Sequence, residues 1–225
     1  MQGGARPMSR GTPDSGLRVL VSGAADGVGL ACAYAFAERG AELILTDSDG
    51  AGLTRATDGA GGFSRFCDVV SEASVAVFAA EIAARYPSID VLINAAGRAY
   101  VRTLGMMLMS RALMPLLRRG TGRRLIVNLA PAGGFVPGDR MFPYAGSREG
   151  FDALSDALVE QTRGSQIGVV SITPQLRRSE ANDPVAPFYR LEQVDEPATA
   201  ARVVDLVASS RPEWRQRALR RDRRA

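Results

Sequence analysis

The chain has 225 residues, 46% of them hydrophobic, which favours one globular domain with an apolar core over a disordered, fibrous or disulfide-rich protein. All 28 basic residues are arginine and histidine is absent, so a serine–histidine triad, an imidazole metal site and a lysine Schiff base are excluded and we predict no metal site. The formal net charge is only +4, which by itself does not indicate a nucleic-acid partner.

The amino-terminal residues 1–16 are rich in glycine, arginine, proline and serine, and we predict a flexible segment there. They contain no apolar stretch that resembles a signal peptide, and no later run approaches the roughly 18 apolar residues of a membrane span. Cys32 and Cys67 lie in or beside apolar runs, which favours buried free thiols and a reducing compartment. We therefore expect a cytoplasmic protein without a membrane partner.

From Leu17 onward, short runs rich in Val, Ile and Leu alternate with longer segments of helical apolar spacing. This alternation predicts one doubly wound α/β domain over residues 17–210, with about six to seven mostly parallel strands and helices on both faces. The predicted strands are Leu17–Val21, Glu42–Thr46, Gly62–Cys67, Val91–Asn94, Arg124–Asn128 and Gly168–Ile172. The predicted helices are Gly27–Arg39, Ala51–Asp58, Ser71–Tyr86, Val101–Arg119, Tyr144–Arg163 and Pro197–Ser209.

Three residues predict where individual helices begin or end. Ser71 precedes an apolar periodic run and suits an N-cap, Gly40 suits a left-handed C-cap, and Pro197 suits the first position of the last helix. The polar stretch 174–196 follows the sixth predicted strand, and we interpret it as a lid or substrate wall in preference to disorder.

The carboxyl end carries the excess positive charge. Residues 211–225 hold seven arginines and two acidic residues, so the rest of the chain is nearly neutral. We interpret this segment as a basic tail that forms a solvated terminal helix, in preference to a nucleic-acid-binding element.

A glycine-rich turn joins the first predicted strand to the first predicted helix. It reads Ser22-Gly23-Ala24-Ala25-Asp26-Gly27-Val28-Gly29, and such glycines let the backbone approach a pyrophosphate while free N–H groups face the phosphates. Asp47 ends the second predicted strand, where a carboxylate can accept hydrogen bonds from both hydroxyls of an adenosine ribose. Because Asp47 and Asp49 would repel a 2′-phosphate, we expect NAD, with NADP less favoured. Asp68 either reaches the adenine amino group or forms a strand-end turn.

These motifs together resemble the short-chain dehydrogenase/reductase family, whose fold is of the Rossmann type. The resemblance rests on Gly23-x-x-x-Gly27-x-Gly29, Asp47, Cys67-Asp68-Val69, Asn94-Ala95-Ala96-Gly97 and Tyr144 in a Tyr-x-x-x-basic pattern, and it covers Leu17 to Ser209. It implies a nicotinamide dinucleotide site made by Ser22, Gly23, Asp26, Gly27, Val28, Gly29, Asp47, Asp68, Val69, Asn94, Ala95, Ala96, Gly97, Tyr144, Arg148, Pro174 and Ser179.

The resemblance implies a catalytic role for Tyr144, which would exchange a proton with the substrate oxygen while hydride moves at the nicotinamide. The family's other catalytic positions are changed. Its lysine is Arg148, which keeps the charge but cannot give up a proton in a relay, and its serine falls on Pro131, which has no hydroxyl. Its relay asparagine falls on Arg102, and Asn128 or Ser147 is a less favoured substitute donor.

Three further features depart from the family pattern at the same end of the site. The connection after Gly97 is unusually short, the family's Pro-Gly after the sixth strand reads Pro174-Gln175, and no final strand is predicted past Ser209. The adenosine half of the site is therefore predicted to be intact and the nicotinamide half eroded.

Two main functional hypotheses follow. The first is a dinucleotide-binding, non-catalytic or partner-dependent subunit that forms a homo- or hetero-oligomer, for example with a catalytically complete homologue. Such pairing would use the helices Val101–Arg119 and Tyr144–Arg163, which carry Met106, Met107, Met109, Met114, Leu154 and Leu158. The second is an atypical NAD-dependent oxidoreductase, interconverting an alcohol and a ketone, that uses Tyr144 with Arg148. A non-redox enzyme on the same scaffold is a further alternative, and a methyltransferase is disfavoured by the glycine spacing.

Overall fold

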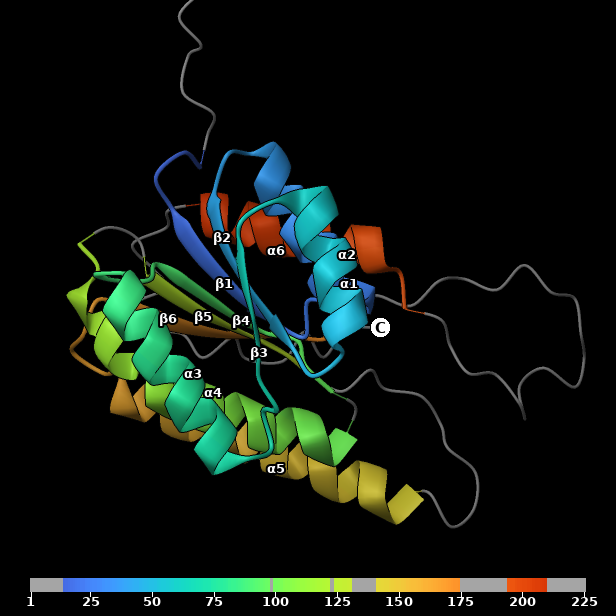
Figure 1. Ribbon diagram of the computed structural model, residues 1–225. Helices are drawn as coiled ribbons and strands as arrows, with labels where there is room; N and C mark the ends of the chain where they lie inside the picture. The colour runs from blue at the N-terminus through green and yellow to red at the C-terminus, as the bar shows by residue number, and fades with distance from the viewer. Residues whose placement is uncertain (1–13, 98, 122–123, 131–140, 175–193, 210–225) are drawn as a thin grey trace, which may run out of the picture.

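The computed structural model of the chain has a six-stranded, entirely parallel sheet at its centre (Figure 1). It describes residues 14–97, 99–121, 124–130, 141–174 and 194–209, without the side chains of residues 99–101 and 141–148. The strand order is β3-β2-β1-β4-β5-β6. The strands are β1 (Arg18–Ser22), β2 (Glu42–Asp47), β3 (Phe63–Phe66), β4 (Val91–Asn94), β5 (Arg124–Leu129) and β6 (Ile167–Ile172).

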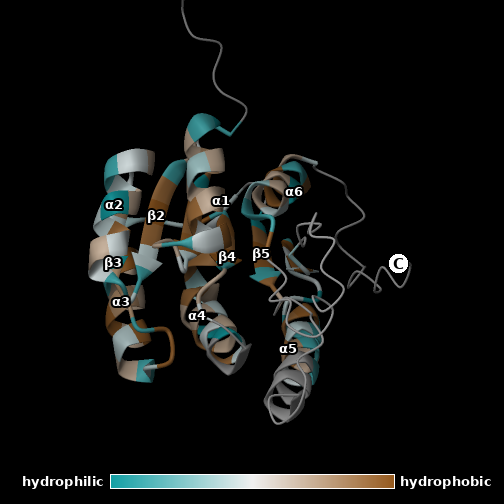
Figure 2. Cartoon of the chain, turned by 90° about the vertical axis from the view of Figure 1, so that its right-hand side faces the viewer, coloured by the Kyte–Doolittle hydropathy of each residue, from teal (hydrophilic) through white to brown (hydrophobic). Residues whose placement is uncertain are grey.

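Six helices cover the two faces of this sheet (Figure 2). One layer contains α1 (Gly27–Glu38), α2 (Gly50–Ala60) and α6 (Glu196–Ala208), and the other contains α3 (Glu72–Arg85), α4 (Ala99–Arg119) and α5 (Met141–Gln161). A separate hydrophobic core lies on each side of the sheet. Strands covered on both faces must be apolar on both faces, which explains the continuous Val, Ile and Leu runs.

The predicted α/β architecture is confirmed, and each predicted strand and helix is present within three residues of its predicted ends. Ser71 is the N-cap of α3, and its side chain accepts a hydrogen bond from the backbone N–H of Ser74. Gly40 has φ +80° and follows α1 with its N–H on the carbonyl of Ala37, as the C-cap prediction requires. Pro197 occupies the second position of α6, because Asp195 is the N-cap of that helix.

The N-cap of α3 provides a test of the local structure. Replacing Ser71 by alanine removes the acceptor for the Ser74 N–H, so we expect the free energy of unfolding to fall by about 1 kcal/mol. Chemical denaturation monitored by circular dichroism measures this change. An unchanged denaturation midpoint would contradict the capping role.

The described fold begins at Asp14, three residues before the predicted domain boundary. The carboxylate of Asp14 is buried and forms an ion pair with Arg39 at the end of α1. The predicted amino-terminal segment otherwise lies outside the described residues, as does the predicted tail. None of the helices in the described ranges is both long and apolar enough to cross a lipid bilayer.

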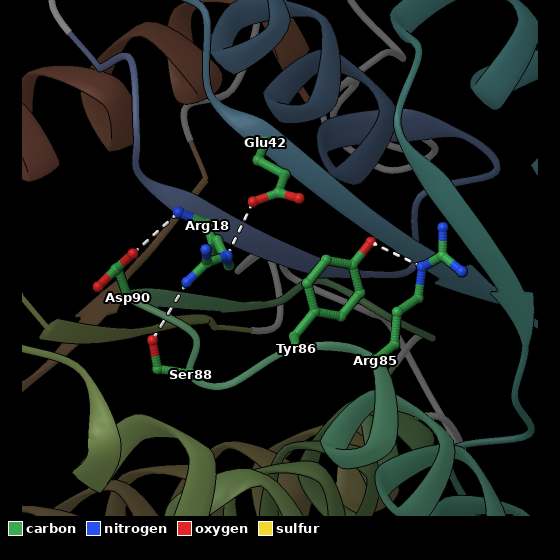
Figure 3. A network of polar contacts seen from close by, with 6 residues as sticks. All are labelled: Arg18, Glu42, Arg85, Tyr86, Ser88 and Asp90. Carbon is green, nitrogen blue, oxygen red and sulfur yellow. Dashed lines mark hydrogen bonds and ion pairs between the residues drawn. The ribbon is translucent and has the colours of Figure 1, made fainter.

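Polar contacts hold the amino ends of three strands together (Figure 3). Arg18, the first residue of β1, donates from Nε to Glu42 at the start of β2 (2.8 Å) and from Nη1 to Ser88 (3.3 Å). Asp90, which precedes β4, accepts a hydrogen bond from the Arg18 backbone N–H at 2.9 Å. These contacts connect β1, β2 and the segment before β4 at the amino edge of the sheet.

Candidate functional site

The sheet reverses its direction of growth between β1 and β4, which are neighbours in space although β2 and β3 separate them in sequence. In open α/β sheets, ligands bind outside the carboxyl ends of the strands at such a switch point. Ser22 and Asn94 end these two strands side by side in the sheet register, and both are buried. The N–H of Ala95 donates to the carbonyl of Ser22 at 2.9 Å, so the predicted segments meet at this point.

The glycine turn after β1 is packed at two positions where only glycine fits. Gly23 has φ +82°, and a Cβ atom there would lie 2.5 Å from the backbone N and Cα of Ala96. A Cβ atom at Gly29 would lie 1.8 Å from the carbonyl oxygen of Gly23. The first glycine therefore allows the turn to contact the segment after β4, and the second seats α1 against the turn.

The amino end of α1 is less closely packed than the glycine turn that precedes it. Its N-cap, Asp26, has an extended backbone and makes no side-chain capping bond. Gly27 has φ +55°, and among the described residues a Cβ atom there would have only the Oε1 of Glu196 within 4 Å, at 3.7 Å. Val28, which follows it, is half-buried. The free N–H groups of this first turn and the space beside Gly27 fit the pyrophosphate of a dinucleotide.

Asp47 connects the end of β2 to the glycine turn. Its Oδ2 accepts a hydrogen bond from the N–H of Ala25 and its Oδ1 from the N–H of Asp49, both at 3.0 Å. These bonds fix a half-buried carboxylate beside the turn. The carboxylate of Asp49 accepts from the N–H groups of Ala51 and Gly52 and so caps α2. The carboxylates of Asp47 and Asp49 therefore both lie at the end of β2, where the sequence analysis predicts that the adenosine ribose binds.

Asp68 forms a turn at the end of β3, which is one of the two roles that the sequence analysis considered for it. The Oδ1 of Asp68 accepts a hydrogen bond from the N–H of Val70 at 3.1 Å, and its own N–H donates to the Oγ of Ser74. Val69 is buried against Gly105 of α4. Contact of Asp68 with adenine remains a prediction.

A buried amide network lies behind the carboxyl edge. The Nδ2 of Asn94 donates to the Oγ of Ser110 at 3.0 Å and to the Oδ1 of Asn128 at 2.8 Å. All three side chains are buried. Asn94 Oδ1 and Asn128 Nδ2 have no hydrogen-bond partner within the described ranges. The Asn128 side chain is thus buried against Asn94, and its role as a substitute for the missing serine hydroxyl stays a prediction.

Arg102 makes contacts that the sequence did not predict. Its Nε and Nη2 donate to the carbonyl of Gly97 at 3.0 and 2.8 Å. Its Nη1 donates to the carbonyls of Leu129 and Ala130 at 3.3 and 3.4 Å. The guanidinium therefore connects the segment after β4 to the end of β5. Its correspondence to the family's relay asparagine stays a prediction.

The structure describes the side chains of some of the remaining predicted site residues but not of others. Ala95 and Pro174 are buried at the ends of β4 and β6, and Gly97 has φ +75°. Tyr144 and Arg148 lie within α5, but their side chains are outside the described part, as is that of Ser147. Pro131, Gln175 and Ser179 also lie outside it.

Neither cysteine is set up as a nucleophile. Both thiols are free and buried. Burial raises the pKa of Cys32 to about 12. Burial, with a smaller contribution from the charge of Asp68, raises the pKa of Cys67 above its usual value. Both thiols therefore stay protonated at neutral pH.

The methionine-rich helix α4 contributes mainly to the core. Met106, Met109 and Met114 are buried within the chain, as is Leu158 of α5. Of the six side chains proposed for a partner surface, only Met107 and Leu154 are partly exposed. Pairing through these two helices stays a prediction.

Comparisons with known proteins find similarity in both sequence and fold. The family model for short chain dehydrogenase matches residues 18–189. D-threitol dehydrogenase from Mycolicibacterium smegmatis is 30% identical over 217 residues, covering 81% of this chain and 83% of that protein. L-fucose dehydrogenase from Bos taurus is 26% identical over 185 residues, covering 73% and 68%. A solved metagenomic short-chain oxidoreductase in complex with NADP has a TM-score of 0.70 at 24% identity, covering 88% of this chain and 93% of that chain.

Proposed function

Because the chain belongs to the short chain dehydrogenase family, we propose that it binds NAD(H) and serves as a non-catalytic or partner-dependent subunit of an oxidoreductase. The observation that carries this proposal is the contrast between the two halves of the carboxyl edge. The half at β1 and β2 keeps a close-packed glycine turn and an oriented acid. The half at β4 and β5 holds the Arg102 guanidinium on main-chain carbonyls, where the family resemblance implies a relay asparagine.

In this proposal, the adenosine ribose binds at Asp47 and the pyrophosphate at the amino end of α1. The Ala25 and Asp49 N–H groups hold the Asp47 carboxylate, so its remaining lone pairs can accept hydrogen bonds from the two ribose hydroxyls. A 2′-phosphate would bring two further negative charges against this carboxylate and against Asp49. This repulsion supports NAD over NADP, although the NADP-bound oxidoreductase shares the fold.

The proposal of an impaired or dependent catalytic half rests on the residue types present there. When bound, the nicotinamide accepts or donates a hydride while a protein group moves the alcohol proton. In the sequence, Pro131 supplies no hydroxyl to hold the substrate oxygen, and one missing donor of this kind costs about 3 kcal/mol of transition-state stabilisation. Arg102 cannot act as an amide that anchors a relay water. A catalytically complete homologue would supply what the chain lacks.

A dinucleotide titration tests this function directly. We expect the purified chain to bind NADH with higher affinity than NADPH and to show no turnover of D-threitol or L-fucose by itself. Isothermal calorimetry measures binding, and absorbance at the nicotinamide band measures turnover. Absence of binding would overturn the dinucleotide proposal, whereas turnover by the isolated chain would overturn only the non-catalytic one.

The relatives favour a second candidate, an active sugar or polyol dehydrogenase. The names of two relatives, D-threitol dehydrogenase and L-fucose dehydrogenase, indicate hydroxylated substrates for those proteins. In this case a bound nicotinamide would take the hydride from the carbinol carbon, and Tyr144 would accept the hydroxyl proton as a phenolate. Arg148, four residues later in α5, would supply the positive charge in place of the family's lysine.

Tyr144→Phe separates the two candidates. If the chain is an active dehydrogenase, removing the phenolic hydroxyl should lower kcat at least about a hundredfold, because the acid–base group is lost. Affinity for NADH should change little. Steady-state kinetics and calorimetry on the same preparation measure both quantities. Unchanged turnover in the variant would exclude Tyr144 as the proton-transfer group.

A further inference from the structure

A carboxylate from α6 lies at the amino end of α1. Glu196 is the first residue of α6, and its Oε1 lies 3.7 Å from the position that a Cβ atom on Gly27, the first residue of α1, would take. The Glu196 side chain is half-buried. Within the described ranges its carboxylate has no hydrogen-bond or ion-pair partner, so no described arginine offsets its negative charge.

Packing between helices fixes the start of α6 at this place. Helices α1 and α6 lie side by side in one layer (Figure 1), and Val203 of α6 and Phe36 of α1 are buried in the same core. The carboxylate of Asp195 caps α6 by accepting a hydrogen bond from the N–H of Ala198 at 3.0 Å. Glu196 therefore extends from a fixed helix end, and rotation of its own side chain is the simplest way for its carboxylate to move.

The amino end of α1 attracts anions. Its free N–H groups and the helix dipole give it a partial positive charge, and its N-cap, Asp26, makes no side-chain capping bond. The Glu196 carboxylate is thus an anion that the folded chain itself brings to this end. In the proposed function, the pyrophosphate of a dinucleotide, with two negative charges, binds at the same helix end.

Two anions at one helix end repel each other. Repulsion between a carboxylate and a doubly charged pyrophosphate near a protein surface lowers the affinity roughly tenfold. We propose that Glu196 competes with the pyrophosphate for the amino end of α1 and so limits the affinity of the chain for dinucleotides; this inference rests on the proposed function.

The competition has a consequence for the role of the chain. A dinucleotide that displaces an internal carboxylate exchanges with the solution and is not retained as a permanent structural group. Binding also requires the Glu196 side chain to leave the amino end of α1. Occupancy of the site is therefore coupled to the beginning of α6.

The test compares dissociation constants for adenosine, ADP and NADH by isothermal calorimetry. Glu196→Gln removes the charge at nearly constant volume, so ADP and NADH should bind at least about fivefold more tightly than to the wild-type chain. Adenosine has no phosphate, so its affinity should not change. Glu38→Gln is the matched control, because Glu38 is exposed at the last position of α1, about 17 Å from the first. This control should leave all three constants unchanged.

The outcomes separate charge from structure. An unchanged NADH affinity in Glu196→Gln overturns the inference, and so does an equal gain for adenosine, which would report a general change in the shape of the site. Glu196→Ala removes the same charge and should give the same gains if Glu196→Gln does not fold. Failure of both variants to fold would assign Glu196 to the fold and overturn the inference.

Failure of the proposed function gives a different result. In that case neither the wild-type chain nor Glu196→Gln would bind ADP or NADH, and the competition would be refuted together with the site. Binding of NADH by the wild-type chain without any gain in Glu196→Gln would leave the proposed function intact and refute the competition alone.

Discussion

Replacing Gly29 by alanine is expected to lower the free energy of unfolding by about 3 kcal/mol and to weaken NADH binding at least roughly a hundredfold. The added Cβ atom would lie 1.8 Å from the carbonyl oxygen of Gly23, and 3.3 Å from the Cβ of Ala95. The first of these contacts is with backbone, which cannot rotate away as a side chain can. Relief requires α1 to move from the turn, and that movement displaces the N–H groups proposed to hold the pyrophosphate.

Denaturant titration and calorimetry on the same variant measure both effects. Gly50→Ala is the matched control, because a Cβ atom there has no neighbour within 4 Å in the part of the chain that the structure describes, and Gly50 begins a helix, α2. We expect this control to be neutral or slightly stabilising, since alanine restricts the unfolded chain more than glycine does. NADH binding by the Gly29 variant with wild-type affinity would contradict the proposed location of the phosphates.

Much of the fold follows from local sequence, because local rules act over a few residues. The helical spacing between apolar runs locates α1 and α3. Gly40 marks where α1 ends, and Ser71 marks where α3 begins. Each of these features depends on backbone geometry that one or two side chains determine. Asp195 was missed as an N-cap because Pro197 also suits a helix start, and the choice between adjacent start positions is decided by packing.

The contacts of the site were less predictable for a physical reason. The close packing at Gly23 and Gly29 and the position of the Asp47 carboxylate could be predicted, because the residues of this motif are close in sequence or on adjacent strands. Arg102 differs, because its long side chain has many rotamers and its partners are main-chain carbonyls, which leave no pattern in the sequence. Its position was assigned from the family resemblance, but its function as a link between two strand ends emerged only from the structure.

The burial of the α4 methionines illustrates a second limit. Met106, Met109 and Met114 have a spacing compatible with either a core or a partner surface. The structure places α4 between α3 and α5 and against the sheet, so most sides of this helix are covered by the chain itself. Sequence periodicity reports that a face is apolar, whereas the order of helices within a layer determines what covers it.

Asp47→Asn is expected to shift cofactor selectivity at least about tenfold toward NADPH. The amide removes the negative charge that would repel a 2′-phosphate, so NADPH should bind relatively better. NADH should bind about tenfold more weakly, because hydrogen bonds from ribose hydroxyls to a carboxylate are stronger than those to a neutral amide. Competitive titration of the two reduced dinucleotides measures the ratio directly.

Asp49, the second acidic residue beside the proposed ribose site, provides the control for the Asp47→Asn variant. Asp49→Asn also removes one negative charge near the 2′-position, but the Asp49 carboxylate is engaged with the N–H groups of Ala51 and Gly52. It is therefore expected to relax the repulsion of NADPH slightly while leaving NADH affinity almost unchanged. In the proposed site Asp47 would act on both dinucleotides and Asp49 only on the phosphorylated one. The Ala25 and Asp49 N–H groups hold the Asp47 carboxylate at the glycine turn, where the ribose is proposed to bind. Equal losses for NADH and NADPH in Asp47→Asn would show that this carboxylate merely supports the Ala25 turn, and the choice of cofactor would then have to lie elsewhere along the edge.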